Sequence, residues 1–217
     1  MSVSKTIVIS CAGMGTRLGI GSTKALIDID GKPLIIRQLE LLKDFDDIRI
    51  VVGYQMEKVI EVVNSYRRDI LFVFNHNYRN TGTGGSFSLA IKHAADMVVS
   101  LDGDLLVHPD DLMSVLHSDD ECVCGAIPCT EDPMLMKTLT QNGQIYGVGF
   151  SREEGEYEWT GLAQVKTSRL TPGDHHVCDM MVPLLPLPMK LIRTKEIDTM
   201  ADYEHAVAWV KSGYADR

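Results

Sequence analysis

The sequence lacks three features that mark large classes of protein: long apolar runs, closely paired cysteines and an excess of basic residues. Within its 217 residues, no apolar run approaches the roughly 18–20 residues that a membrane-spanning helix needs. The first residues also do not lead into the apolar stretch of a signal peptide. We therefore expect a cytoplasmic protein that does not act at a membrane.

The cysteines do not form the framework of a disulfide-rich or zinc-binding protein. Their number is odd, and they lack the two-residue spacing of a zinc knuckle. Cys122 and Cys124 alternate with Val123, so both side chains should point to one face of a strand. We expect reduced, buried packing residues there, with thiolate metal ligands as the less favoured alternative. The five cysteines are Cys11, Cys122, Cys124, Cys129 and Cys178.

The charge balance is acidic. Lysine and arginine total 21 against 30 aspartates and glutamates, which gives a net charge of −9. A field of that sign disfavours nucleic acid and anionic lipid as partners, so basic residues that gather at one place are informative. With 45% hydrophobic and 24% charged residues and no internal repeat or linker, we expect one globular domain over 1–217.

Apolar runs and helical periodicity alternate through the first half of the chain, which is the main indication of fold. Strands that are apolar at nearly every position and alternate with helices imply a parallel sheet covered on both faces. The predicted strands are 6–11, 48–53, 70–74 and 97–101, and the predicted helices are about 33–45, 55–66, 86–95 and 109–117.

The second half has shorter alternating segments. Asn142-Gly143 is a typical two-residue hairpin turn, flanked by 136–139 and 145–148. Together the two halves predict an α/β fold: a single-domain, Rossmann-like, doubly wound and mostly parallel sheet with an appended hairpin. The remaining predicted elements are strands at 122–127, 159–166 and 190–193 and a closing helix at 201–211.

A glycine-rich loop, Ala12-Gly13-Met14-Gly15-Thr16-Arg17-Leu18-Gly19, follows the first strand, where open α/β sheets bind ligands. Leu18 stands where a dinucleotide fingerprint needs Gly or Ala, and the P-loop spacing is absent. Arg17 in the loop and Lys24 shortly after it suit a triphosphate, because Arg forks onto phosphate oxygens and Lys is a point charge. The alternative is that both are solvated loop charges.

These residues carry a family resemblance that covers nearly the whole chain. The sequence resembles the sugar-phosphate and phospho-alcohol nucleotidyltransferases, and its 75–89 segment is most similar to phosphocholine-type cytidylyltransferases and their phosphonate-activating relatives. The matching motifs are Ala12-Gly13-Met14-Gly15-Thr16-Arg17-Leu18, Lys24-Ala25-Leu26, Gly31-Lys32-Pro33-Leu34, Asn75 to Thr83 with Ser86, Ser88 and Leu89, Asp102-Gly103-Asp104, Trp159-Thr160-Gly161, Glu196-Ile197-Asp198-Thr199 and Asp202-Tyr203.

Two carboxylates are candidate metal ligands. Asp102-Gly103-Asp104 follows the strand at 97–101, and two acids in a turn suit a magnesium ion that also binds phosphate oxygens. The resemblance implies that Asp104 and Asp198 hold Mg²⁺ on the triphosphate, with Asp102 nearby. The alternatives are a turn residue for Asp102 and a helix N-terminal acid for Asp198.

The loop 81–86 is the candidate base-binding segment, because it offers backbone amides at the start of a helix. The alternative for Ser86 is a plain N-cap. The resemblance implies that Arg17 and Lys24 grip the triphosphate. The expected nucleotide-binding residues are Ala12, Gly13, Gly15, Thr16, Thr83, Gly84, Ser86 and Asp102.

The acceptor pocket is expected near Trp159. In Tyr157-Glu158-Trp159, an aromatic face beside a carboxylate could hold a cationic head group, although Trp159 could instead be core packing or a shelf for a sugar. Lys195 is a candidate for the acceptor phosphate. A metal cluster at 175–179 is disfavoured, because adjacent His side chains on an extended chain point apart.

The sequence thus predicts a magnesium-dependent nucleotidyltransferase, a monomer or homodimer. We expect it to move CMP from CTP onto a small phosphorylated alcohol or phosphonate and to release pyrophosphate. Alternatives are a sugar-1-phosphate nucleotidyltransferase, a molybdenum-cofactor-type guanylyltransferase and an inactive nucleotide-binding regulatory domain. A nicotinamide dehydrogenase is disfavoured, because Val51-Val52-Gly53-Tyr54 supplies no acid for the ribose.

Overall fold

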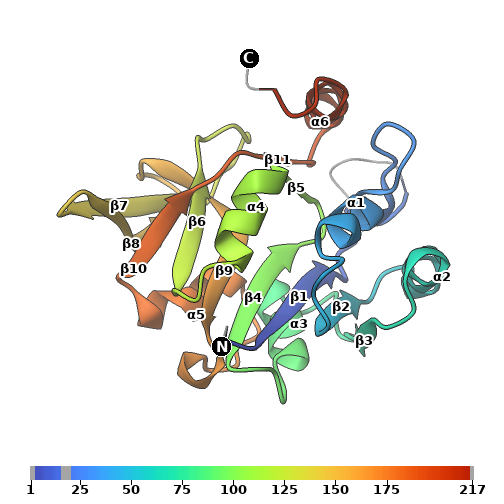
Figure 1. Cartoon of the computed structure of the whole chain (residues 1–217), viewed down its shortest axis with the longest axis horizontal. Coiled ribbons are helices and arrows are strands. Elements are labelled where there is room, and N and C mark those ends of the chain that lie inside the picture. Colours follow the sequence, from blue (N-terminus) through green and yellow to red (C-terminus); the bar gives the residue numbers. More distant parts are fainter. Residues whose placement is uncertain (1–2, 16–20, 216–217) are drawn as a thin grey trace.

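A nine-stranded sheet forms the centre of the molecule, with helices on both of its faces (Figure 1). The computed structural model describes residues 3–15 and 21–215. The strand order is β3-β2-β1-β4-β9-β6-β10-β8-β7, and β11 and β5 form a second, two-stranded sheet. The strands are β1 (Lys5–Cys11), β2 (Ile48–Val52), β3 (Leu71–Phe74), β4 (Met97–Asp102), β5 (Leu105–Val107), β6 (Cys122–Ala126), β7 (Leu135–Gln141), β8 (Gln144–Ser151), β9 (Tyr157–Lys166), β10 (Leu187–Leu191) and β11 (Thr194–Glu196). The helices are α1 (Leu34–Leu41), α2 (Met56–Tyr66), α3 (Thr83–Ala90), α4 (Pro109–Leu116), α5 (Val177–Met181) and α6 (Met200–Lys211).

The first half confirms the predicted doubly wound α/β fold. Strands β3, β2, β1 and β4 are parallel neighbours. Alternate residues of β1 point to opposite faces: Ile7 and Ile9 pack in the core with α1, α2 and α4, while Val8 packs in the core with α3 and α5. This is why the strand is apolar at consecutive positions.

Beyond β4 the sheet becomes mixed. Strand β9 runs antiparallel to both β4 and β6, and β6 is parallel to β10. The predicted hairpin is confirmed as β7 and β8. Both turn residues have positive φ, 52° at Asn142 and 78° at Gly143, as a type I′ turn requires. Cys122 and Cys124 are free and buried in one core cluster, as expected from their alternation.

Some elements differ from the prediction. Helix α3 starts and ends earlier than the predicted 86–95, because its first turn contains Gly84 and Gly85, which have low helix propensity and are held by tertiary contacts. The short elements β5, β11 and α5 were not predicted, since three to five residues carry too little periodicity. In the part of the chain that the structure describes, no helix is long and apolar enough to span a membrane.

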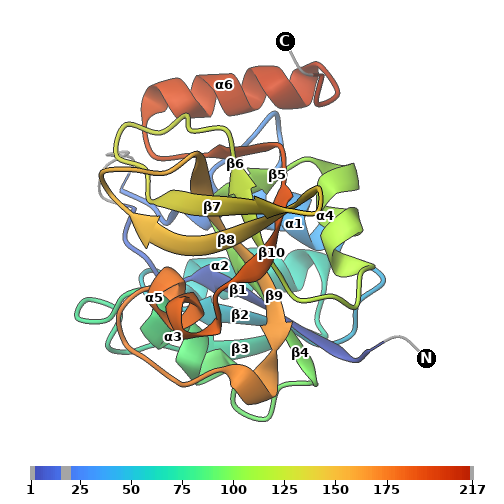
Figure 2. The same cartoon turned by 90° about the vertical axis from the view of Figure 1, so that its left-hand side faces the viewer.

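A third core cluster joins the chain segments that form the site. Helix α6 lies over the β5–β11 sheet (Figure 2). Its Ala206 and Trp209 pack with Ile29, Leu106 and Ile197. Ile29 closely follows Lys24 in the chain, Leu106 closely follows Asp104, and Ile197 directly precedes Asp198. One apolar cluster therefore fixes the three chain segments that carry these polar residues relative to one another.

Candidate active site

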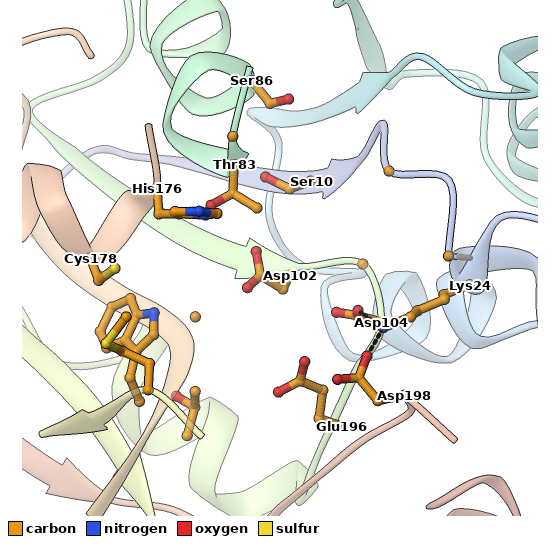
Figure 3. Close-up of a pocket in the computed structure, with 18 of the residues that line it drawn as sticks. Ser10, Lys24, Thr83, Ser86, Asp102, Asp104, His176, Cys178, Glu196 and Asp198 are labelled. Carbon is orange, nitrogen blue, oxygen red and sulfur yellow. Dashed lines mark hydrogen bonds and ion pairs between the residues drawn. The ribbon is translucent and has the colours of Figure 1, made fainter. Parts of the chain in front are cut away.

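A cleft of about 440 Å³ opens beyond the carboxyl ends of β1 and β4. It contains most of the residues that the sequence singled out, but Gly84 does not line it and Thr16 and Arg17 lie outside the described residues. Figure 3 shows Lys24 and three carboxylates at one end, Thr83 and His176 at another, and Asp102 between them. The predicted residues that line the cleft are Ala12, Gly13, Gly15, Lys24, Thr83, Ser86, Asp102, Asp104, Trp159 and Asp198.

Three carboxylates meet at one end of the cleft. The acidic cluster consists of Asp104, Glu196 and Asp198, one ligand oxygen of each lying within 4.8 Å of the others. Antiparallel pairing of β11 with β5 brings them together: Glu196 pairs with Leu105, and the Ile197 amide donates to the Asp104 carbonyl at 3.3 Å. Burial and the nearby carboxylates, Asp104 first, raise the pKa of Glu196 to about 8.

Lys24 is the cation that the acidic cluster holds in this structure. Its Nζ donates to Asp104 Oδ2 at 2.8 Å and to Asp198 Oδ1. Burial alone would lower the pKa of the ammonium, but the ion pairs with Asp104 and Asp198 outweigh burial and raise that pKa above its usual value. Lys24, Asp104 and Asp198 therefore form one ion-pair network. The sequence analysis had assigned Lys24 to the triphosphate and the two acids to Mg²⁺.

The acidic cluster has the chemistry of a magnesium site. Carboxylate oxygens are the protein ligands that Mg²⁺ prefers, and a positive charge already lies among them. Glu196 is the member that the sequence analysis missed. Its signal was the Glu196-Ile197-Asp198 spacing, since residues two apart on an extended chain point to the same side while the buried Ile197 points to the other.

Asp102 lies between the two groups of residues that Figure 3 labels. Burial, followed by the charge of Asp104, raises its pKa to about 7. Among the described residues, its Oδ1 atom is buried without a hydrogen-bond partner. Gly161 faces the carboxylate with φ +76°, and a Cβ there would lie 2.1 Å from Asp102 Oδ2. The glycine of Trp159-Thr160-Gly161 is therefore required by the close approach of Asp102.

The candidate base-binding loop is arranged differently from the prediction. The amides of Gly82 and Gly84 donate to the carbonyls of Asp174 and His175 at 2.8 and 3.0 Å, so they are not open to a ligand. A Cβ at Gly82 would lie 1.8 Å from the His175 carbonyl oxygen. The two glycines thus allow the 174–177 segment to pack against the start of α3.

Ser86 is not the helix cap. Helix α3 begins at Thr83 with Gly82 as the N-cap, so the N-cap alternative for Ser86 is wrong. Its hydroxyl lines the cleft and accepts a hydrogen bond from Asn75 Nδ2 at 3.0 Å. Thr83 Oγ1 accepts from the Val177 amide at 3.2 Å, which joins α3 to α5.

Trp159 also lines the cleft, and its ring meets Phe150 edge-on with 5.2 Å between centroids. The neighbouring Glu158 does not offer a free carboxylate to a cation. It is buried and accepts hydrogen bonds from the 127–134 loop. Lys195, the candidate for the acceptor phosphate, is on β11 and is not among the described residues that line the cleft.

The chain is similar to one family of known proteins. A family model described as MobA-like NTP transferase domain matches residues 7–172. The bifunctional protein GlmU of Aliarcobacter butzleri is 36% identical over 155 residues, which are 71% of this chain and 36% of that protein. GlmU of Sulfurovum sp. is 30% identical over 135 residues, 61% of this chain and 30% of that protein. The chain thus spans about a third of the length of these relatives.

Solved structures share the fold over the whole chain. The inositol-1-phosphate CTP transferase of T. maritima has a TM-score of 0.72 at 18% identity and covers 100% of this chain and 99% of its own. CTP:phosphocholine cytidylyltransferase (LicC) of Streptococcus pneumoniae has a TM-score of 0.71 at 19% identity, with coverages of 96% and 100%. HddC of Yersinia pseudotuberculosis, complexed with GMP-PN, has a TM-score of 0.70 at 20% identity, with coverages of 95% and 99%.

Proposed function

The chain belongs to the MobA-like NTP transferase domain family, and from that premise we propose that it transfers a nucleoside monophosphate from an NTP to a small phosphorylated or phosphonate acceptor. Pyrophosphate is the second product. The observation that carries the proposal is the joining of Lys24 with the acidic cluster in a cleft that Trp159 also lines. We assign the part with Lys24 to the triphosphate and the part lined by Trp159, the acceptor end, to the acceptor's organic part.

The acidic cluster and Lys24 serve the triphosphate. Asp104, Glu196 and Asp198 would hold Mg²⁺, which supplies positive charge against the phosphate oxygens. The Lys24 ammonium, held beside these carboxylates, would bind phosphate oxygens as a point charge. The glycines Gly13 and Gly15 let the backbone come close to the same group.

The reaction needs positioning more than covalent help. An oxygen of the acceptor phosphate attacks the α-phosphorus, a new P–O bond forms, and the bond to the leaving pyrophosphate breaks. Charge accumulates on the pyrophosphate oxygens as that bond breaks, so a preorganised cation such as Lys24 lowers the barrier. Asp102 lies close enough to the acidic cluster for the charge of Asp104 to raise the pKa of its carboxyl.

CTP is the proposed nucleotide, and a phosphorylated alcohol or aminoalkyl phosphonate with its head group near Trp159 is the proposed acceptor. Two proteins with the same fold over their full length are described as CTP-dependent transferases, which supports cytidine. A third, HddC, is complexed with GMP-PN. A guanylyl or other nucleotidyl transfer to a sugar phosphate is therefore the second candidate.

The test is a substrate matrix. The protein is incubated with each of the four NTPs, Mg²⁺ and a panel of phosphorylated alcohols, sugar phosphates and phosphonates, and pyrophosphate is measured. We expect CTP with a phosphorylated amino alcohol or aminoalkyl phosphonate to be best. Asp104→Asn keeps the shape of the side chain but removes its charge, and it should lower turnover about a hundredfold, or ~3 kcal/mol. Asp110→Asn, on the first turn of α4, is the control and should leave turnover unchanged.

Pyrophosphate release with no NTP and acceptor of the panel would refute the proposal. Near-normal turnover by Asp104→Asn would refute the role of the acidic cluster while leaving the transferase activity in place.

A further inference from the structure

The 127–134 loop crosses over the end of β9. It leaves β6 after Ala126 and enters β7 at Leu135, and both of these residues pair with Glu158 of β9. Glu158 therefore lies directly beneath the loop, between the strand that the loop leaves and the strand that it enters. At the far end of the loop, the Trp159 amide donates to the Met134 carbonyl at 2.7 Å.

Glu158 holds the middle of this loop through both carboxylate oxygens. Its Oε2 accepts from the amides of Cys129 at 2.8 Å and Thr130 at 3.3 Å, and its Oε1 accepts from the Thr130 hydroxyl. The side chain belongs to a residue that is only 5% exposed. A buried carboxylate that accepts three donors has little capacity left for a ligand.

The loop in turn forms a wall of the cleft. Thr130, Asp132, Pro133 and Met134 line it next to Glu158 and Trp159 of β9. Most of the loop is exposed to solvent on its outer side, including Ile127 and Cys129. With few apolar contacts of its own, the loop depends on fixed hydrogen bonds for its position.

We propose that Glu158 is a positioning residue: it fixes the 127–134 loop as a wall of the acceptor end of the cleft and does not itself contact the acceptor's head group. This inference rests on the proposed function, because it assigns the part of the cleft lined by Trp159 to the acceptor. It differs from the expectation that the Glu158 carboxylate pairs with a cationic head group beside Trp159. If Glu158 positions the loop, a neutral glutamine should largely replace it. If Glu158 pairs with a cationic head group, glutamine should not.

The experiment compares Glu158→Gln with Glu158→Ala. Glutamine keeps one acceptor oxygen for the two amides, and its Nε2 can donate to the Thr130 hydroxyl oxygen, all without charge, whereas alanine removes every hydrogen bond to the loop. Thr130→Val removes the loop hydroxyl that donates to Glu158 Oε1. Glu156→Gln is the matched control, because Glu156 also accepts a neighbouring strand's amide, that of Thr138, but does not line the cleft.

Two readouts are needed. Hydrogen exchange of the Cys129 and Thr130 amides is measured on the protein without substrate. The KM values for NTP, for an acceptor with an ammonium head group and for its neutral isostere are measured in parallel. Charge-assisted hydrogen bonds are about twice as strong as neutral ones, so Glu158→Gln should keep about half of the hydrogen-bond energy that holds the loop.

We expect Glu158→Ala to expose the two amides to exchange and to raise KM for both acceptors by about tenfold or more, with the KM for NTP unchanged. Glu158→Gln should stay within about threefold of the wild type, and Thr130→Val should fall between them. Glu156→Gln should match the wild type.

Three results would overturn the proposal. Unchanged exchange of the two amides in Glu158→Ala would mean that the carboxylate does not hold the loop. A faster-exchanging loop with unchanged acceptor KM would mean that the loop is not a wall of the acceptor end. A loss in Glu158→Gln equal to that in Glu158→Ala, but only for the ammonium acceptor, would make Glu158 a direct ligand. Absence of any turnover in the wild type would instead refute the proposed function, and the exchange measurement would still decide whether Glu158 holds the loop.

Discussion

Replacing Lys24 by methionine tests the central geometry of the cleft, because it removes the cation that the acidic cluster holds while keeping most of the side chain's volume. The Lys24 side chain is 12% exposed, and those of Asp104 and Asp198 are 23% and 9% exposed. Removing one partner of a fully buried ion pair costs about 3–5 kcal/mol. For this partly buried pair we expect Lys24→Met to lower the free energy of unfolding by about 2–4 kcal/mol in the presence of EDTA.

The metal dependence of that variant is the more specific part of the prediction. In the wild type a divalent cation that binds the acidic cluster would have to displace the ammonium, whereas in Lys24→Met the three carboxylates have no resident cation. Mg²⁺ should therefore restore stability to the variant and add less to the wild type. A ligand at a hundred times its dissociation constant stabilises by about 2.7 kcal/mol.

The assay is urea unfolding in EDTA and across a Mg²⁺ series, with Lys32→Met as the matched control. Lys32 pairs with Glu40 at the surface, where both side chains are more than a third exposed, and such pairs contribute at most about 1 kcal/mol. Lys24→Met should also raise the KM for NTP, whereas Lys32→Met should not. Equal unfolding free energies for the two variants in EDTA, or equal Mg²⁺ effects on wild type and Lys24→Met, would refute this reasoning.

Three further predictions concern Gly161, Trp159 and Glu196. Gly161→Ala should destabilise the protein in urea by about 2 kcal/mol more than Gly143→Ala, because both have φ near +78° but only Gly161 faces a carboxylate; equal losses would contradict the close approach of Asp102. Trp159→Leu should raise the KM for a cationic acceptor, by a loss of about 1–2 kcal/mol in its binding free energy, and should not change the KM for NTP; an unchanged acceptor KM would place the head group elsewhere. The raised pKa of Glu196, about 8, means that the folded state binds more protons than the unfolded chain from about pH 4.5 to 8, so in EDTA stability should fall as pH rises through that window. Glu196→Gln should flatten that fall in urea titrations at a series of pH values, and an unaltered slope would count against the burial of this acid.

Local signals in the sequence were sufficient for the fold class and for the position of the cleft. Consecutive apolar residues in β1 and β4 required a sheet covered on both faces, and the acids after β4 had to lie at its carboxyl end. The Asn142-Gly143 turn specified its hairpin, because two successive positive φ angles are tolerated by few residue pairs. Lys24, Asp104 and Asp198 were each identified as functional candidates from residue type and motif.

Only the tertiary structure decided which of these groups share a partner. The pairing of β11 with β5 brings Glu196 and Asp198 close to Asp104, which is far from them in the sequence. Strands of three residues are too short for a periodic pattern, so this two-stranded sheet cannot be predicted from the sequence. The same holds for two corrections. The amides of Gly82 and Gly84 donate hydrogen bonds to the 174–177 segment, and the Glu158 carboxylate accepts hydrogen bonds from the 127–134 loop. Residue type determines which hydrogen bonds and ion pairs a side chain is able to make, whereas the packing of distant segments determines which of them it makes.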